Sequence, residues 1–375
     1  MQSVMRRWLK WWPIIIVLIG GLCVLGIAHD DGLYQQSIMK ITTVKTTANE
    51  QQSDQFENKD RQITQAVTGT ITNGKDKGQQ LTIKNTYMKS QATTQAYYRH
   101  QHVFLTLHRH HGKITSSTIS GLKRDTSLAF VVWLTLGVLL ILMRFSGAMA
   151  FLSVVVNAVL FAMAVNWNSD TQGSKVLVIF GLLAIVFAAL TLLIVIGPNE
   201  QMLMTLATTI GGTALSIIIA LLVFMVTNEK GVYYESMQYV TQLPKPLFLA
   251  ETLLGSLGAV MDESTDIIAS LTALKEERPD VTAKQIFKSG RQIGGEIMGP
   301  LINVLFFIFV ADTLPLALLY FKNANSWGYT FNMTMSLGVI QSLISGIGIV
   351  LTVPLACGIT SMVLGGKKPW ARLRH

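Results

Sequence analysis

The chain has 375 residues, of which 50% are hydrophobic and only 14% are charged, and its mean hydropathy is +0.44. No soluble domain of this length needs so much apolar sequence, so the composition excludes an ordinary soluble enzyme and indicates an integral membrane protein. A net charge of +9 also suits nucleic-acid binding, but the basic residues lie mostly beside apolar runs, where they orient a protein in a membrane. We therefore expect the lipid bilayer, and no nucleic acid, as a partner.

The N-terminus, MQSVMRRWLKWWPIIIVLIGGLCVLGIAHDD, has a basic start followed by an apolar run. Cleaved signal peptides and uncleaved anchor helices share this pattern. Trp11, Trp12 and Pro13 open the apolar run, and GIAHDD is a poor cleavage site. We therefore predict an uncleaved anchor helix over residues 1–28, with a cleaved signal peptide as the alternative.

Residues 29–126 are polar and show alternating strand patterns. AVTGTITNGKDKGQQLTIKNTY predicts a strand, a turn rich in Gly, Asp and Lys, and a second strand, and HVFLTL predicts a further strand. We expect a small β-rich domain framed by a flexible stretch near 47–60. Because Cys23 and Cys357 both lie in apolar segments, this domain must be stable without a disulfide.

Five of the seven histidines cluster in this domain, at His100, His102, His108, His110 and His111. Alternate positions on a strand share one face, and neutral imidazole binds transition metals. No carboxylate or cysteine completes a standard site, however, and a solvated polar strand has the same pattern. A solvated strand is the simpler explanation, and metal binding at His100, His102, His108 and His110 is the alternative.

Apolar stretches long enough to cross a hydrocarbon core of about 30 Å recur along the chain. We place eight spans near residues 12–28, 127–145, 147–166, 174–197, 203–227, 247–273, 298–321 and 334–363. Only RFSGA separates the second span from the third, which predicts a tight helical hairpin. The sequence thus predicts an α-helical polytopic membrane protein with a β-rich domain between its first and second helices.

Clusters of Lys and Arg orient these spans. They precede the first span, fill a predicted loop over 275–291, and follow the last span. With eight spans, all three clusters lie on one side, the cytoplasm. We therefore predict a multi-pass protein with both termini cytoplasmic, built from an anchor helix (1–28), an extracytoplasmic β-rich domain (29–126), a seven-helix membrane domain (127–365) and a basic tail (366–375).

The predicted span 247–273 contains an unusual acidic run, SLGAVMDESTDIIASL. At 100° per residue, a stripe of roughly 80° on this helix contains Glu251, Gly255, Gly258, Asp262 and Asp266. Glu263 leaves the stripe by about 60° from Asp266. Glycines allow a neighbouring helix to approach closely. We therefore expect Gly255 and Gly258 to serve helix packing, and the stripe to face protein or a water-filled path.

Three carboxylates at mid-membrane would cost on the order of 8–10 kcal/mol unless they are protonated, hydrated or paired. No Lys or Arg lies well inside any predicted span, which leaves bound protons, a bound cation or water to offset the cost. We expect no fixed cofactor beyond such a proton or cation. The alternative is that the acids emerge at the cytoplasmic headgroups, because Asp262 lies about 22 Å along the helix from Leu247.

Asp312 lies about two-thirds of the way along the predicted span 298–321 and is followed by Pro315. Proline removes a backbone donor and frees carbonyls that can bind a cation. A wet, kinked outer helix end explains the same pair equally well. Asn157 and the segment TTIGGT at 208–213 add polar atoms at membrane depth, which we expect to form helix–helix contacts.

Three segments resemble the YibE/F-like family of bacterial membrane proteins: VTGTITNGKDKGQQLTIKN, LGSLGAVMDESTDIIASL and GRQIGGEIMGPLINVLFF. With the span arrangement, the resemblance covers roughly residues 60–365. Glu296 stands where the family has an acidic residue before Met-Gly, and Asn303 matches a polar position. Glu263 and Asp266 look like additions, because small residues usually follow the preceding Asp in the family. The resemblance implies a multi-pass protein of the bacterial plasma or inner membrane, with transport as the usual expectation.

We predict a transporter or permease for a small solute or ion, with proton- or cation-coupling carboxylates at Glu251, Asp262, Glu263, Asp266, Glu296 and Asp312, and with Asn303 beside the path. One alternative is a non-catalytic envelope scaffold or receptor that acts through its β-rich domain. A second is a Mg²⁺-dependent prenyl-diphosphate enzyme, but the chain has one acidic motif where such enzymes need two, and it has no HExxH, GxSxG or P-loop. A homo- or hetero-oligomer is compatible with each hypothesis.

Overall fold

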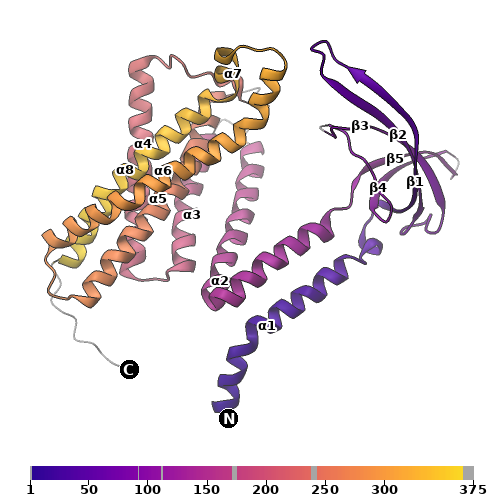
Figure 1. Cartoon of the computed structure of the whole chain (residues 1–375). Helices are drawn as coiled ribbons and strands as arrows, with labels where there is room; N and C mark the ends of the chain where they lie inside the picture. The colour runs from indigo at the N-terminus through magenta and orange to yellow at the C-terminus, as the bar shows by residue number, and fades with distance from the viewer. Residues whose placement is uncertain (1, 92, 111–112, 171–174, 238–242, 366–375) are drawn as a thin grey trace. The chain divides into compact units, whose positions relative to one another are not determined.

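The computed structural model of the chain describes residues 2–91, 93–110, 113–170, 175–237 and 243–365. The predicted basic tail, 366–375, lies outside them. The chain divides into two compact units, Met1–Ala148 and Met149–His375. The first contains a helix, a β-sheet and the first arm of a long helix, and the described residues of the second form helices and the connections between them (Figure 1).

The first unit contains a five-stranded antiparallel sheet in the order β3-β2-β1-β4-β5. Its strands are β1 (Ser37–Ser53), β2 (Lys59–Ile71), β3 (Gln80–Met88), β4 (His102–His110) and β5 (Lys113–Leu122). Alternate apolar residues on these strands form one buried core, which includes Met39, Val67, Ile83, Val103 and Leu105. The strands predicted from the two sequence patterns are confirmed.

The prediction of a flexible stretch near residues 47–60 is wrong. β1 pairs with β2 as far as Ser53 and Lys59, so only five residues separate the strands. The Asp54 carboxylate closes this turn by accepting hydrogen bonds from the backbone N–H groups of Phe56 and Asn58, both at 2.9 Å. Polar residues on a two-stranded ribbon resemble a flexible linker in composition, and pairing between strands is a property that composition does not report.

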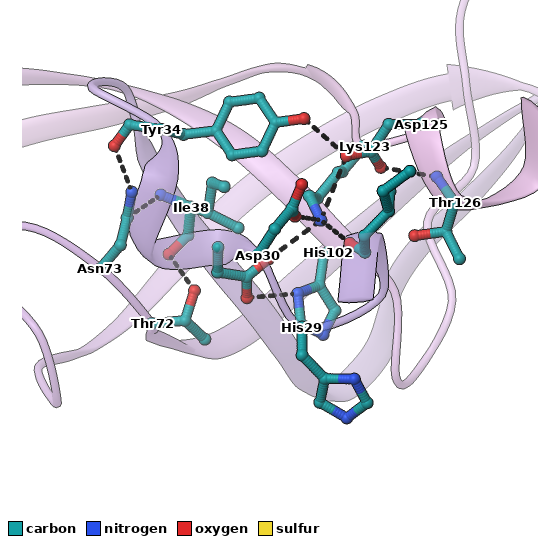
Figure 2. A network of polar contacts seen from close by, with 12 residues as sticks. His29, Asp30, Tyr34, Ile38, Thr72, Asn73, His102, Lys123, Asp125 and Thr126 are labelled. Carbon is teal, nitrogen blue, oxygen red and sulfur yellow. Dashed lines mark hydrogen bonds and ion pairs between the residues drawn. The ribbon is translucent and has the colours of Figure 1, made fainter. Parts of the chain in front are cut away.

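A buried lysine joins the sheet to both of the helices that flank it in the chain (Figure 2). The Lys123 side chain is 3% exposed, and its Nζ lies 2.6 Å from Asp30, 3.3 Å from Asp31 and 3.2 Å from Asp125. Nζ also donates to the carbonyl of Ile27, at 3.2 Å. Because Ile27 ends α1 (Gln2–Ile27) and Asp125 begins α2 (Asp125–Asp170), Lys123 ties both helix ends to the sheet.

The cluster around Lys123 keeps its charges. Burial acts to raise the pKa of Asp31, but the Thr72 hydroxyl, His102 and Lys123 together lower that pKa below its usual value. Burial acts to lower the pKa of Lys123, and hydrogen bonds to Asp30, Asp125 and Asp31 raise it above its usual value. His102 Nδ1 lies 2.7 Å from Asp31 Oδ2 and adds a further polar contact to the cluster.

Helices α1 and α2 pack together through one tryptophan. Trp133 Nε1 donates to the carbonyl of Val17 at 2.8 Å, and Gly20 and Gly21 lie against the indole ring. The backbone of α2 breaks at Arg144, where φ is 51° and ψ is −120°. Any side chain at Gly147 would clash with the carbonyl of Leu139. The break falls inside RFSGA, where the sequence predicts the chain to turn.

The second unit surrounds one central helix, α5 (Pro244–Glu277). Besides the second arm of α2 it contains α3 (Val176–Val195), α4 (Glu200–Thr227), α6 (Ala283–Lys322), α7 (Trp327–Thr334) and α8 (Ser336–Gly365). α5 packs against α3, α4, α6 and α8. The core between α5 and α8 includes Ile267, Leu271, Val353 and Ala356.

Small and hydroxyl residues allow these helices to approach closely. Gly212 of α4 lies against Thr352 and Val260, so a side chain there would overlap both. Thr209 and Ser264 share a hydrogen bond of 2.8 Å between α4 and α5. Asn157 Nδ2 donates to Thr191 Oγ1 at 2.7 Å. The prediction that these polar residues form helix–helix contacts is confirmed.

Five helices are long and apolar enough to cross a membrane: Asp125–Ser169, Val176–Val195, Glu200–Thr227, Ala283–Lys322 and Ser336–Gly365. The length and apolar composition of these helices are those of a membrane protein. The predicted count of eight spans stays a prediction, because α2 is a single long helix here and neither α1 nor the acidic α5 is among these five.

Most of the loop predicted over 275–291 is helical. α5 runs to Glu277 and α6 begins at Ala283, so of the basic residues in this segment only Arg278 lies between the two helices. Thr282 and Gln285 form a capping box that starts α6. A capping box satisfies N–H groups that the first helical turn leaves free, which explains why a helix begins in so polar a segment.

Candidate functional site

Helix α5 places its acidic residues on two faces. Glu251, Gly255, Gly258, Asp262 and Asp266, the stripe identified from the sequence, are all exposed. The same exposed face continues toward the C-terminal end of α5 through Ser270, Ala273 and Glu277. These eight positions occupy an arc of roughly 120° on the helix. We call this face the α5 stripe.

The N-terminal end of the α5 stripe opens into a cavity of about 640 Å³, which we call the α5–α8 cavity. Carboxylates from two helices line it, Glu251 of α5 and Asp312 of α6. The Gln341 amide of α8 lies against Gly255, so the glycine makes room for a polar side chain. Its described lining residues are Ser236, Met237, Phe248, Glu251, Gly255, Leu305, Ile308, Phe309, Asp312, Thr313, Leu316, Met333, Thr334, Leu337, Gly338, Gln341, Ser342 and Ser345.

The charge balance of the α5–α8 cavity is entirely negative, because its described lining contains no Lys or Arg. α6 runs through Pro315, which lacks the N–H that would bond the carbonyl of Ala311, next to Asp312. Phe248, Phe309 and two methionines supply apolar walls. Such a site suits a small cation that carries some apolar surface, or a hydrated inorganic cation.

A second cavity, of about 430 Å³, lies between α5 and α6 at the other end of the stripe. Glu277 of α5 and Glu296 of α6 line it together with Ser270 and Gln292. Gln292 Nε2 lies 3.5 Å from Glu296 Oε1. On α5, Gly258, Asp262 and Asp266 occupy the positions between the two cavities, so acidic residues follow the stripe from one end to the other.

Glu263 lies outside the α5 stripe, about 120° around the helix from Glu251. Its side chain is 0% exposed, and neither carboxylate oxygen has a hydrogen-bond partner among the residues that the structure describes. Helical geometry already placed Glu263 outside the stripe, but our sequence analysis treated it as a coupling carboxylate together with Asp262 and Asp266. The structure separates it from them, because the turn of α5 before it carries Val260 and the turn after it carries Ile267, both completely buried.

Two of the other predicted positions lie apart from the cavities. Asn303 is exposed, lines neither of them, and donates to the carbonyl of Gly299 on its own helix at 3.0 Å. A methyl group at Gly258 would meet no described atom within 4 Å, whereas one at Gly255 would lie 2.9 Å from the Gln341 amide; the packing role of both glycines stays a prediction.

The histidines of the β-rich domain do not converge. His102 pairs with Asp31, His100 occupies a turn with φ of 71°, and His108 and His110 lie farther along β4. His111 lies outside the described residues. Within the described ranges, no group of three or more His, Cys, Asp or Glu side chains is placed to hold a metal ion.

Two family matches cover most of the chain. Residues 131–366 match the family described as YibE/F-like protein, and residues 32–122 match the YibE/F family N-terminal domain. Comparisons with curated proteins and with solved structures gave no match. The first match contains both cavities and the whole of α5, and the second contains the β-sheet. This chain therefore belongs to the YibE/F-like family.

Proposed function

We propose that the protein is a transporter that moves a small cation, or a small solute with protons or cations, along the α5 stripe. It would work as a multi-pass protein of the bacterial plasma or inner membrane, with both termini in the cytoplasm. The observation that carries this proposal is the α5–α8 cavity, which Glu251 and Asp312 both line with no Lys or Arg in the described lining.

Physical chemistry supports a cationic occupant. A carboxylate at the centre of a membrane costs about 2.5–3.5 kcal/mol, so a pair of them persists where water, protons or cations compensate their charge. The volume also fits, because binding sites for small molecules measure about 300–1,000 Å³. Acids at Asp262, Asp266, Glu277 and Glu296 extend the negative surface beyond the cavity and give a cation further positions to occupy.

The test is ion flux into proteoliposomes that contain the full chain. A pH-sensitive dye reports proton movement under an imposed potential, and gradients of Na⁺ and K⁺ are tested in turn. Under the proposal, Glu251→Gln and Asp312→Asn each reduce the flux at least tenfold, since each removes a charge from the cavity. Glu276→Gln is the matched control, because Glu276 is exposed on α5 outside both cavities.

Equal flux from wild type and from both cavity variants would end this proposal. A flux present only for Na⁺ or only for protons would identify the coupling ion. Loss of flux in Glu276→Gln as well would show a general effect of charge on α5, and that result would also count against the cavity.

A second candidate, an envelope scaffold or receptor, is favoured by the β1–β2 hairpin. Its outer part is exposed almost throughout from Lys45 to Lys59 and offers backbone and polar side chains to a partner. Replacing residues 51–61 by an Asn-Gly turn would join Glu50 to Gln62, which face each other in the sheet. Flux is retained in this variant if the protein is a transporter, whereas a scaffold loses its cellular function.

A further inference from the structure

Glu263 carries the least compensated acidic group among the described residues of α5. The side chain is 0% exposed, both carboxylate oxygens lack a hydrogen-bond partner, and no ion pair reaches it from the described part of the chain. By contrast, Glu251, Asp262, Asp266 and Glu277 are exposed on the stripe. Glu263 therefore needs an explanation that solvent does not provide.

Apolar residues of α5 one turn before and one turn after Glu263 pack closely against neighbouring helices. One turn earlier, Val260 lies against Gly212 of α4 and Gly348 of α8. One turn later, Ile267 lies against Gly294 of α6, which also touches Val353 of α8. Glu263 thus lies between two turns of α5 that pack closely against α4, α6 and α8.

The neighbouring helices bring no described cation to this position. α3 has no titratable residue, α4 has only Glu200 at its start, and α8 has only Cys357. The short helix η2 (Tyr234–Ser236) carries Tyr234 and Glu235 near the start of α5. The ionisable groups of α6 are Lys284, Lys288, Arg291, Glu296, Asp312, Tyr320 and Lys322, and all of these except the half-buried Tyr320 are exposed.

An ionised carboxylate without a partner in such surroundings is so costly that the group takes up a proton instead. A metal cation in its place would need several oxygen ligands around it, whereas no described group bonds the Glu263 carboxylate, and the adjacent Ser264 hydroxyl shares its hydrogen bond with Thr209. We propose that Glu263 is protonated in this arrangement of the helices and is a proton-binding site within the membrane domain. Its role in coupling rests on the proposed transport function.

Release of this proton has a defined direction. Asp266 lies three residues further along α5, a neighbouring position on a helix, and it faces the exposed stripe. For the proton to leave by this route, the helices around Glu263 must separate, the O–H bond of Glu263 must break, and an O–H bond must form on a carboxylate oxygen of Asp266. The negative charge then moves from Asp266 to Glu263, and the proton enters the stripe. Closing of the helices requires Glu263 to be protonated again.

The proton can be detected without any transport assay, through the pH dependence of stability. If Glu263 is neutral in the folded chain and ionised in the unfolded chain, the folded state binds one more proton, so stability falls as pH rises. The full chain in detergent should therefore lose melting temperature between about pH 6 and pH 8.5, above the range in which a solvated Glu titrates. Glu263→Gln should lack this loss, and Asp266→Asn should retain it.

Two results would overturn the assignment: equal pH slopes for wild type and Glu263→Gln, or stabilisation of wild type but not of Glu263→Gln by Na⁺ at constant pH. Mass spectrometry of wild type treated with a hydrophobic carbodiimide is independent of any variant's folding. This reagent attacks protonated carboxyls in apolar surroundings, so at about pH 7.5, where solvated carboxyls are ionised, it should modify Glu263; an unmodified Glu263 contradicts the proposal. If the stability and labelling results are as expected but no ion flux is found, the transport proposal fails and the proton-binding site at Glu263 stands.

Discussion

Lys123 shows how one side chain can fix the position of a domain on its helices. Its charge is nearly inaccessible to water, and three aspartates from the segments before β1 and after β5 surround it. Taking such a cation out of water is costly, and only several carboxylates in good geometry offset that cost. The arrangement makes Lys123 far more important for the stability of the first unit than an average lysine.

We expect Lys123→Met to destabilise the first unit by about 3–5 kcal/mol, because three neighbouring carboxylates would be left without their cation. Lys84→Met is the matched control, since Lys84 is exposed on β3 and should change stability by no more than about 0.5 kcal/mol. Thermal unfolding of the full chain, monitored by proteolysis of the β-rich domain, measures the stability of both variants. Equal melting of the two variants would contradict the structural role of the cluster.

The same cluster predicts a pH window. The lowered pKa of Asp31 gives stability above its unfolded value, about 3.9, that is lost as pH falls through the folded value. The raised pKa of Lys123 gives stability below about 10.4 that is lost as pH rises through the folded value. We expect the β-rich domain to be most resistant to proteolysis between about pH 4 and 10, with a smaller acid-induced change in Lys123→Met. If acid does not increase proteolysis of the wild-type β-rich domain, the predicted role of this cluster in stability is wrong.

At the scale of the helix, periodicity predicted the acidic stripe of α5 but did not predict that Glu263 is buried. The stripe from Glu251 to Asp266 follows from 3.6 residues per turn alone, and all of its members are exposed on one face. The burial of Glu263 depends on which helices cover the other face, and this is set by residues far away in sequence, such as Gly348 and Gly294. The α5–α8 cavity was unpredictable for the same reason, because α6, α7 and α8 all contribute to it.

Adjacent glycines on α6 offer a matched test of helix packing. A methyl group at Gly294 would lie 2.7 Å from Val353 and 3.1 Å from Ile267, whereas a methyl group at Gly295 meets no atom within 4 Å. Gly294→Ala should destabilise the second unit by about 1–3 kcal/mol through overpacking. Gly295→Ala should be neutral or stabilise it by up to about 1 kcal/mol, because alanine favours helix. Melting in detergent compares them, and an unaffected Gly294→Ala would show that α6 and α8 are less closely packed than described.

At the scale of the molecule, composition predicted the class of protein, and alternation predicted the strands of the sheet. The predicted number of spans is not confirmed, because the two arms of α2 form one helix that breaks at Arg144, and the acidic α5 is not among the five long apolar helices. The polar hairpin of β1 and β2 and the helical connection between α5 and α6 also escaped prediction. In both, pairing and capping supply the hydrogen bonds that a loop would take from water.

The central claim is that the α5 stripe borders a water-filled path through the membrane domain, and cysteine accessibility tests it most directly. In a chain whose two cysteines have been replaced, single variants Gly258→Cys, Asp262→Cys and Asp266→Cys are treated in intact membranes with a charged, water-soluble thiol reagent. Leu182→Cys is the control, because Leu182 is 56% exposed on the apolar helix α3. We predict that all three stripe positions react and that Leu182→Cys does not. Reaction confined to Asp266→Cys, with Gly258→Cys and Asp262→Cys inert, would place the acids at the headgroups and contradict the path.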